Sequence, residues 1–179
     1  DAGYDILYSC TSCGLCLLND YQKIMKIPQA KKIAENTYDI HEYILRLMDD
    51  DYIKPQFQKV NRKLAYHIPC HLRALGIGYP AAKLMALIPG LECHVLDDAC
   101  CGLSGSYGFK KSNENTSIQL GSMAVSRIGK TGADVIVADC GSCRMQLAGL
   151  SGMPSYDPVE ILCESLGMNT QKTMNADKR

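Results

Sequence analysis

The sequence predicts an α/β fold in which a mainly parallel sheet is flanked by helices. Two observations favour this class. Short apolar segments of strand length alternate with segments whose apolar residues recur every three to four positions, and one strand–helix unit occurs twice. Parallel strands need long crossover connections, which are usually helices. The chain has 179 residues, of which 46% are hydrophobic, so it can bury a substantial core.

The repeated unit consists of a strand, a Cys-x-x-Cys motif and a helix. Residues 3–8 run into Cys10-Thr11-Ser12-Cys13, and residues 132–137 run into Cys140-Gly141-Ser142-Cys143. We interpret these units as a tandem pseudo-repeat whose first copy is truncated, because the first copy lacks the residues that precede the strand in the second. The chain also begins at Asp1, within an apolar stretch, and we expect it to be part of a longer protein.

Helices are predicted after each motif. The first contains apolar residues at helical spacing, namely Leu17, Leu18, Tyr21, Ile24 and Met25. A second apolar stripe covers residues 40–48. Its counterpart in the second copy begins at Asp157, which can cap a helix, with Pro158 at the first helical position and Glu160 completing a capping box.

The second copy is predicted to be complete. Its expected elements are strands over 63–67, 93–96 and 134–139, a helix from Pro80 to Pro89-Gly90, and a helix through Ile118, Val125 and Ile128 that ends near Gly129. We divide the chain into a partial first module (1–50), a linker (51–62), a complete second module (63–167) and a tail (168–179).

The composition excludes some functions. The 19 basic and 19 acidic residues give a formal net charge of zero, which argues against nucleic acid as the main partner. The sequence has no run of about 18 apolar residues, the length needed to span a bilayer. We therefore expect no transmembrane segment.

Ten cysteines make the chain rich in thiols, and five of them follow predicted strands of the second copy. These five are Cys70, Cys100, Cys101, Cys140 and Cys143. Strand ends at one edge of a parallel sheet lie close together, so these thiols are expected to converge. The adjacent pair can serve one site only from a turn, and the glycines Gly102, Gly105 and Gly108 favour a turn there.

Spacing alone leaves three kinds of site open. Zinc would use four of these ligands, with His67 or His71 as a substitute for one thiol. An iron–sulfur cluster usually takes four thiolates, so a fifth would be unusual. A dithiol oxidoreductase needs only Cys140 and Cys143, which would leave the other three thiols without a role.

The remaining cysteines and histidines have simpler interpretations. Cys16, Cys93 and Cys163 lie in or beside apolar runs and are expected to be buried structural thiols. His67 and His71 flank Cys70. Because enough cysteines are present to act as ligands, these histidines are expected to form hydrogen bonds or support the structure rather than to bind the metal. His41 and His94 are expected to have no special role, and Lys110-Lys111 to form a solvated turn.

The cysteine pattern resembles the cysteine-rich CCG family of iron–sulfur subunits. Cys100-Cys101-Gly102 follows Cys70 after 29 residues, and 38 residues separate Cys101 from Cys140. The resemblance covers roughly residues 3–165. It is strongest to the iron–sulfur subunit of anaerobic glycerol-3-phosphate dehydrogenases and extends to heterodisulfide reductases and to lactate- and glycolate-oxidising systems. The matching segments are Tyr66-His67-Ile68-Pro69-Cys70, Gly76-Ile77-Gly78, Leu87-Ile88-Pro89-Gly90-Leu91 and Cys100-Cys101-Gly102 through Tyr107-Gly108.

The resemblance implies a 4Fe–4S cluster, non-cubane in the heterodisulfide reductase relatives, held by Cys70, Cys100, Cys101, Cys140 and Cys143. Cys10 and Cys13 would be the remnant of a first site. The implied role is electron transfer in anaerobic respiration, from a flavoprotein partner toward a quinone or a disulfide, in the cytoplasm or at the inner face of its membrane. The alternatives are a zinc-binding structural module and a Cys-x-x-Cys dithiol oxidoreductase. No substrate-binding residue is indicated.

Overall fold

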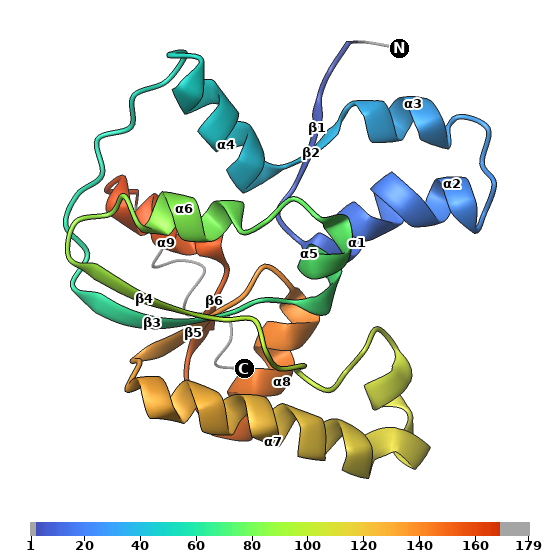
Figure 1. Cartoon of the computed structure of the whole chain (residues 1–179), viewed down its shortest axis with the longest axis vertical. Coiled ribbons are helices and arrows are strands. Elements are labelled where there is room, and N and C mark those ends of the chain that lie inside the picture. The colour runs from blue at the N-terminus through green and yellow to red at the C-terminus, as the bar shows by residue number, and fades with distance from the viewer. Residues whose placement is uncertain (1–2, 169–179) are drawn as a thin grey trace.

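The computed structural model describes residues 3–168 and contains two parallel sheets (Figure 1). The larger sheet has the strand order β4 (Leu91–Leu96), β3 (Arg62–His67), β5 (Val135–Val137) and β6 (Ser155–Tyr156). The smaller sheet pairs β1 (Ile6–Tyr8) with β2 (Thr37–Asp39). Every pairing is parallel, which confirms the predicted α/β class. The predicted tail lies outside the described residues apart from Met168.

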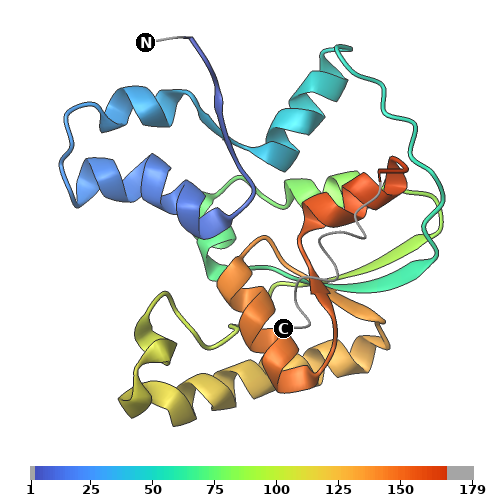
Figure 2. The same ribbon diagram turned by 180° about the vertical axis from the view of Figure 1, so that it is seen from behind.

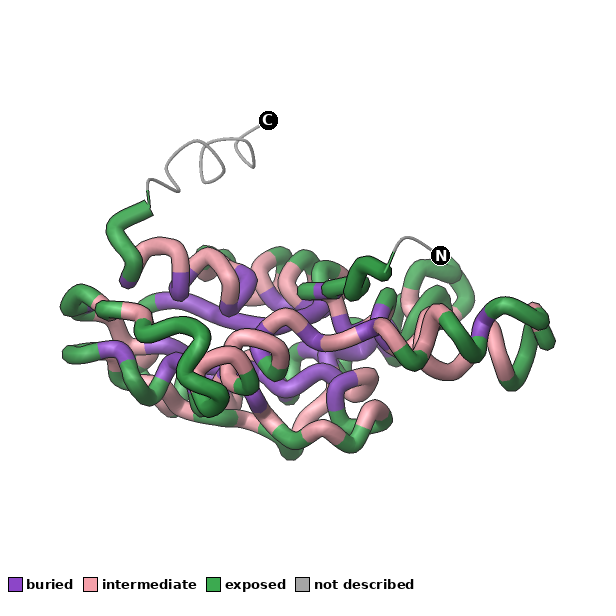
Figure 3. The backbone as a smooth tube through the Cα atoms, turned by 90° about the horizontal axis from the view of Figure 1, so that it is seen from above, coloured by how far each residue is buried: buried purple, intermediate pink, exposed green. Residues whose placement is uncertain are grey.

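Helices cover both faces of the larger sheet. The helices α6 (Pro80–Met85) and α9 (Pro158–Ser165) lie on one face, and α7 (Glu114–Thr131) and α8 (Gly141–Ser151) lie on the other (Figure 1). The buried part of the backbone runs through the centre of the molecule between these layers (Figure 3). In the described part of the chain, no helix is both long enough and apolar enough to cross a bilayer.

Alternating side chains of the central strands build two separate cores. Leu64 and Tyr66 of β3 pack into the cluster that includes residues of α6 and α9. Ala65 of β3 and Ile136 of β5 pack into the cluster under α7 and α8. Successive strand residues point to opposite faces, so a strand buried on both faces is apolar throughout. The second cluster also contains Cys101, Cys140 and Cys143.

The predicted capping box at Asp157 is confirmed, and the structure shows a second aspartate cap at Asp39. Asp157 accepts the amide of Val159 while the Glu160 carboxylate accepts the amide of Asp157, which completes the capping box of α9. Asp39 accepts the amides of His41 and Glu42 at the start of α4 (Ile40–Asp49). The end of α7, predicted near Gly129, lies two residues later at Thr131, where Gly132 has a positive φ of 64° that suits a left-handed cap.

Residues 3–49, which precede β3 and are called the first segment below, lie beside the larger sheet rather than over it (Figure 2). It contains α1 (Thr11–Leu15), a π-helical turn (Cys16–Asp20), α2 (Tyr21–Lys23) and α3 (Ala30–Glu35). Apolar residues at helical spacing are expected to face a core, but Ile24 and Met25 lie beyond the end of α2 and are 71% and 59% exposed. The reason is that β1 and β2 form only a short two-stranded sheet among the described residues.

Two features connect the first segment to the rest of the chain. The helix α1 packs against α5 (Cys70–Leu75), and α4 packs against α6. Each segment that contains a Cys-x-x-Cys motif runs from a strand through the motif into a helix, then through a second parallel strand to a helix capped by an aspartate. The tandem-repeat interpretation and its domain limits stay predictions. Short 3₁₀ turns at Tyr107–Phe109 and Lys111–Asn113 lead into α7.

Leu64→Ala tests the core between β3 and α6. Leu64 is fully buried, so its truncation should lower the free energy of unfolding by about 2–5 kcal/mol. The matched control is Leu120→Ala on α7, where the side chain is 39% exposed and a change of less than about 0.5 kcal/mol is expected. Urea unfolding followed by circular dichroism measures both. Equal losses would contradict the assignment of Leu64 to the core.

Candidate metal centre

Three strand ends of the larger sheet supply the candidate ligands. Cys70 begins α5 after β3, Cys100 and Cys101 lie in the loop after β4, and Cys140 caps α8 after β5. Because the strands are parallel, all of these positions lie at the same edge of the sheet. Four thiols line one pocket there, from Cys70, Cys101, Cys140 and Cys143. All ten cysteines of the chain are free thiols.

The most buried part of the pocket joins Cys101, Cys143 and His67. The sulfurs of Cys101 and Cys143 are 3.1 Å apart, and one ring nitrogen of His67 lies within 4.8 Å of both. The thiol of Cys143 donates to Cys101, and this bond, together with the neighbouring His67, lowers the pKa of Cys101 to about 5 although burial opposes the shift. This lowered pKa favours the thiolate form of Cys101, which is the form that binds metals.

Cys140 is the second cysteine for which the surroundings favour the thiolate. Hydrogen bonds from the thiols of Cys10 and Cys143 and from the Ser12 hydroxyl lower its pKa. The pKa of Cys143 is raised, because this thiol donates to both Cys101 and Cys140. Cys143 thus stays protonated between two sulfurs that favour the thiolate, and a bound cation would displace its proton.

Cys70 and Cys100 complete the group of five. Burial raises the pKa of the Cys70 thiol, and the neighbouring Cys100 raises it further. Cys100 is half-buried and lies beside the pocket rather than in its lining. Its sulfur accepts the amide of Gly102 at 3.3 Å, which is the kind of backbone hydrogen bond that stabilises a ligand sulfur.

The turn after Cys101 requires glycine. Gly102 has φ of 93°, and a Cβ atom there would collide with the carbonyl oxygen of Ser117 in α7. The turn therefore packs directly on α7, and this contact holds Cys101 against the sheet. The sequence predicted a turn at this position, but the partner helix could be seen only in the structure.

The first segment also reaches the pocket. The Ser12 hydroxyl lies 2.7 Å from Nδ1 of His71 and 3.4 Å from the sulfur of Cys140. Cys10 is hydrogen-bonded to Cys140, whereas Cys13 is exposed. The pair predicted as a remnant of a first site is therefore divided, with one thiol at the complete site and the other facing solvent.

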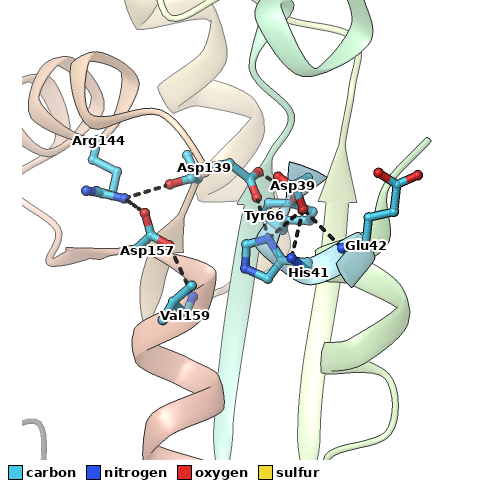
Figure 4. A network of polar contacts seen from close by, with 9 residues as sticks. Asp39, His41, Glu42, Tyr66, Asp139, Arg144, Asp157 and Val159 are labelled. Carbon is cyan, nitrogen blue, oxygen red and sulfur yellow. Dashed lines mark hydrogen bonds and ion pairs between the residues drawn. The ribbon is translucent and has the colours of Figure 1, made fainter. Parts of the chain in front are cut away.

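A buried polar network surrounds Asp139, the residue before Cys140 (Figure 4). Nδ1 of His41 is 3.2 Å from a carboxylate oxygen of Asp39 and 3.7 Å from one of Asp139, and the Tyr66 hydroxyl donates to Asp139 at 2.5 Å. The prediction that His41 has no special role is wrong, because it is fully buried between these two carboxylates. The sequence gives no signal for this arrangement, because Tyr66 and Asp139 are distant from His41 along the chain.

The other predictions have mixed outcomes. Cys16, Cys93 and Cys163 are half-buried rather than buried, because each lies on an outer element of the fold. Burial still raises the pKa of Cys93 to about 11. His94 pairs with Glu92 at the surface, and Lys110-Lys111 is exposed, as predicted. His67 and His71 both lie within hydrogen-bonding reach of groups at the pocket.

Comparisons with known proteins agree on the cysteine-rich region. Residues 64–148 match the family described as CCG, a cysteine-rich domain. The chain is 30% identical over 92% of its length to a subunit of the anaerobic glycerol-3-phosphate dehydrogenase of Escherichia coli K12, of which it covers 41%. It is 26% identical over 92% of its length to a subunit of the dihydromethanophenazine:CoB–CoM heterodisulfide reductase of Methanosarcina barkeri, covering 41% of that protein. The chain is also 31% identical over 75% of its length to lactate utilization protein A of Bacillus licheniformis, and it covers 55% of that protein.

Gly102→Ala tests the contact between the cysteine turn and α7. The substitution should reduce the free energy of unfolding more than Gly152→Ala does, because both glycines have positive φ but only Gly102 has no room for a Cβ atom. The control should lose about 1–2 kcal/mol from backbone strain alone. Urea unfolding measures both variants. Equal losses would mean that the turn can move away from α7 without cost.

Asp139→Asn tests the buried network. Burial raises the pKa of Asp139 from 3.8 to about 6. The folded protein therefore binds this proton more tightly than the unfolded chain, and the resulting stabilisation is lost as the pH rises from about 4 to about 6. Asparagine cannot ionise, so the stability of the variant relative to the wild type should rise across this range by up to about 3 kcal/mol.

Urea unfolding at several pH values between 4 and 7 measures this difference. The exposed Asp50→Asn variant is the control and should show the pH dependence of the wild type. A constant difference between Asp139→Asn and the wild type would contradict the perturbed carboxyl group.

Proposed function

We propose that the chain is the cluster-binding part of an iron–sulfur electron-transfer subunit, because residues 64–148 match the family described as CCG, a cysteine-rich domain. The proposed ligands are Cys70, Cys100, Cys101, Cys140 and Cys143, all of which lie within the matched residues. The proposed cofactor is a 4Fe–4S cluster, with the non-cubane type as the specific expectation because five thiols are present.

The observation that carries this proposal is the convergence of four thiols on one pocket with a fifth beside it. Iron–sulfur clusters are held by thiolates, so the donor set fits the group. The pKa values of Cys101 and Cys140 are lowered, so two of the ligands favour the charged form before any metal binds. When bound, such a cluster accepts and gives up single electrons.

The residues around the pocket have supporting roles. The amide of Gly102 donates to the sulfur of Cys100, and His67 lies beside the sulfur of Cys101. Hydrogen bonds of this kind stabilise negative charge on a cluster and raise its reduction potential. The core under α7 and α8, to which Cys101, Cys140 and Cys143 belong, excludes water from that side.

The proposed partners follow from the relatives. The chain spans less than half of the glycerol-3-phosphate dehydrogenase relative, so the rest of that protein has no counterpart in the residues at hand. We infer a glycerol-3-phosphate dehydrogenase-like complex in which a flavoprotein partner supplies electrons and a quinone or a disulfide accepts them. The proposed location is the cytoplasm or the inner face of the cytoplasmic membrane, reached through the partner proteins.

One observation favours a second candidate, a zinc-stabilised structural module. His67, Cys101 and Cys143 place three ligand atoms within 4.8 Å of one another, a spacing that suits a single metal ion. This candidate leaves Cys70 and Cys100 without a role. A dithiol oxidoreductase built on Cys140 and Cys143 leaves three thiols unexplained.

Anaerobic reconstitution with ferrous iron and sulfide tests the proposal. The wild-type chain should become brown and contain iron and acid-labile sulfide in equal amounts. Cys140→Ser and Cys143→Ser should each lose more than half of the bound iron, because each removes a ligand. Cys163→Ser on α9 is the matched control and should retain it, since this thiol does not line the pocket.

Either of two other results would overturn the cluster proposal. Zinc without sulfide, lost in His67→Ala, would support the structural module. A chain that binds neither metal and cycles between dithiol and disulfide at Cys140 and Cys143 would support the oxidoreductase.

A further inference from the structure

The hydroxyl of Ser12 joins the first segment to the metal pocket. It lies 3.4 Å from the sulfur of Cys140 and 2.7 Å from Nδ1 of His71, so one oxygen contacts a proposed ligand and a second side chain at once. Ser12 belongs to α1 and lies outside the residues that match the cysteine-rich family, whereas Cys140 and His71 lie inside them.

The backbone fixes the position of Ser12 relative to Cys140. The amide of Thr11 donates to the carbonyl oxygen of Asp139 at 3.0 Å, and Asp139 immediately precedes Cys140. Thr11 is fully buried, and α1 packs against α5, which contains His71. The serine, the histidine and the ligand are therefore held by adjoining backbone segments rather than by long mobile side chains.

The number of available protons determines which atom donates in the contact between Ser12 and Cys140. A metal-bound cysteine is a thiolate and has no proton to donate. A serine hydroxyl has one proton and two lone pairs. With Cys140 bound, the Ser12 proton must point at the sulfur if the contact is a hydrogen bond. The Ser12 oxygen then accepts a hydrogen bond from Nδ1–H of His71, which selects the tautomer protonated on Nδ1.

We propose that Ser12 and His71 are positioning residues that form a two-step hydrogen-bond relay to the sulfur of Cys140 and raise the reduction potential of the centre. The relay rests on the proposed function, because it acts on a cluster ligand. Reduction adds one electron to the centre, and the added negative charge is partly carried by the ligand sulfurs. A hydrogen bond to Cys140 stabilises the reduced state more than the oxidised state.

The size of the expected effect follows from one hydrogen bond to a charged acceptor. Such a bond contributes enough to change the equilibrium constant for reduction about tenfold. For a one-electron couple, a tenfold change corresponds to about 59 mV. The hydrogen bond between His71 and Ser12 polarises the hydroxyl, so loss of His71 should shift the potential in the same direction by less.

Redox titration of the anaerobically reconstituted chain tests the relay, with electron paramagnetic resonance as the readout. Ser12→Ala should lower the midpoint potential by about 59 mV, the tenfold change above, and alter the g-values of the reduced centre. Ser12→Thr keeps the hydroxyl and should restore the wild-type potential. His71→Ala should lower the potential, whereas His71→Asn can donate from a similar position and should restore it.

Ser126→Ala is the matched control, because Ser126 is an exposed helical serine on α7. It should leave the potential and the g-values unchanged. If Ser12→Ala does not fold, the two His71 variants test the relay on their own.

The outcomes separate the relay from the proposed function. A wild-type chain that binds no iron overturns the function. If wild type and Ser12→Ala bind iron equally and have the same midpoint potential, the function stands and the relay is wrong. A lowered potential in Ser12→Ala that Ser12→Thr does not restore would also overturn the relay, because the effect would then not come from the hydroxyl.

Discussion

The constraint on which the structure depends is the parallel pairing of β3 with both β4 and β5. Parallel strands present their carboxyl ends at one edge, so chain segments that follow different strands meet there without further guidance. Cys70, the Cys100-Cys101 pair and Cys140 each occupy such a position. An antiparallel exchange of any one of these strands would move its cysteine to the opposite edge, and the pocket could not form.

The pocket is continuous with the hydrophobic core. Cys101, Cys140 and Cys143 belong to the same buried cluster as Ala65 and Ile136, which anchors the sulfurs to the central strands of the sheet. Burial alone would oppose charge on these thiols, and it does raise the pKa of Cys70. Hydrogen bonds reverse this effect at Cys101 and Cys140. The local hydrogen-bond donors, rather than solvent, therefore decide which sulfurs ionise.

Local patterns in the sequence were sufficient for the main strands and helices of the second copy and for the expectation that its thiols converge. The capping box at Asp157, the strand predicted over 63–67 and observed over 62–67, and the edge position of the cysteines follow from periodicity and from the few residue types that suit each position. Contacts between distant segments could not be predicted in this way. No sequence pattern indicates that Gly102 meets Ser117, or that His41 lies between Asp39 and Asp139. Exposure was also misjudged where an apolar stripe, as at Ile24, has little sheet to cover.

The same long-range contacts show that the site is built by both segments of the chain. Thr11 donates to the backbone of Asp139, Ser12 reaches the sulfur of Cys140, and His41 lies against the carboxylate of Asp139. These contacts converge on two consecutive residues, Asp139 and Cys140, which follow the central strand β5. A thiol held from only one side could rotate away from a metal, whereas Cys140 is constrained by its own strand and by the first segment. The matched residues 64–148 contain the thiols, but the conformation and electrostatics of one of them depend on a helix that precedes them.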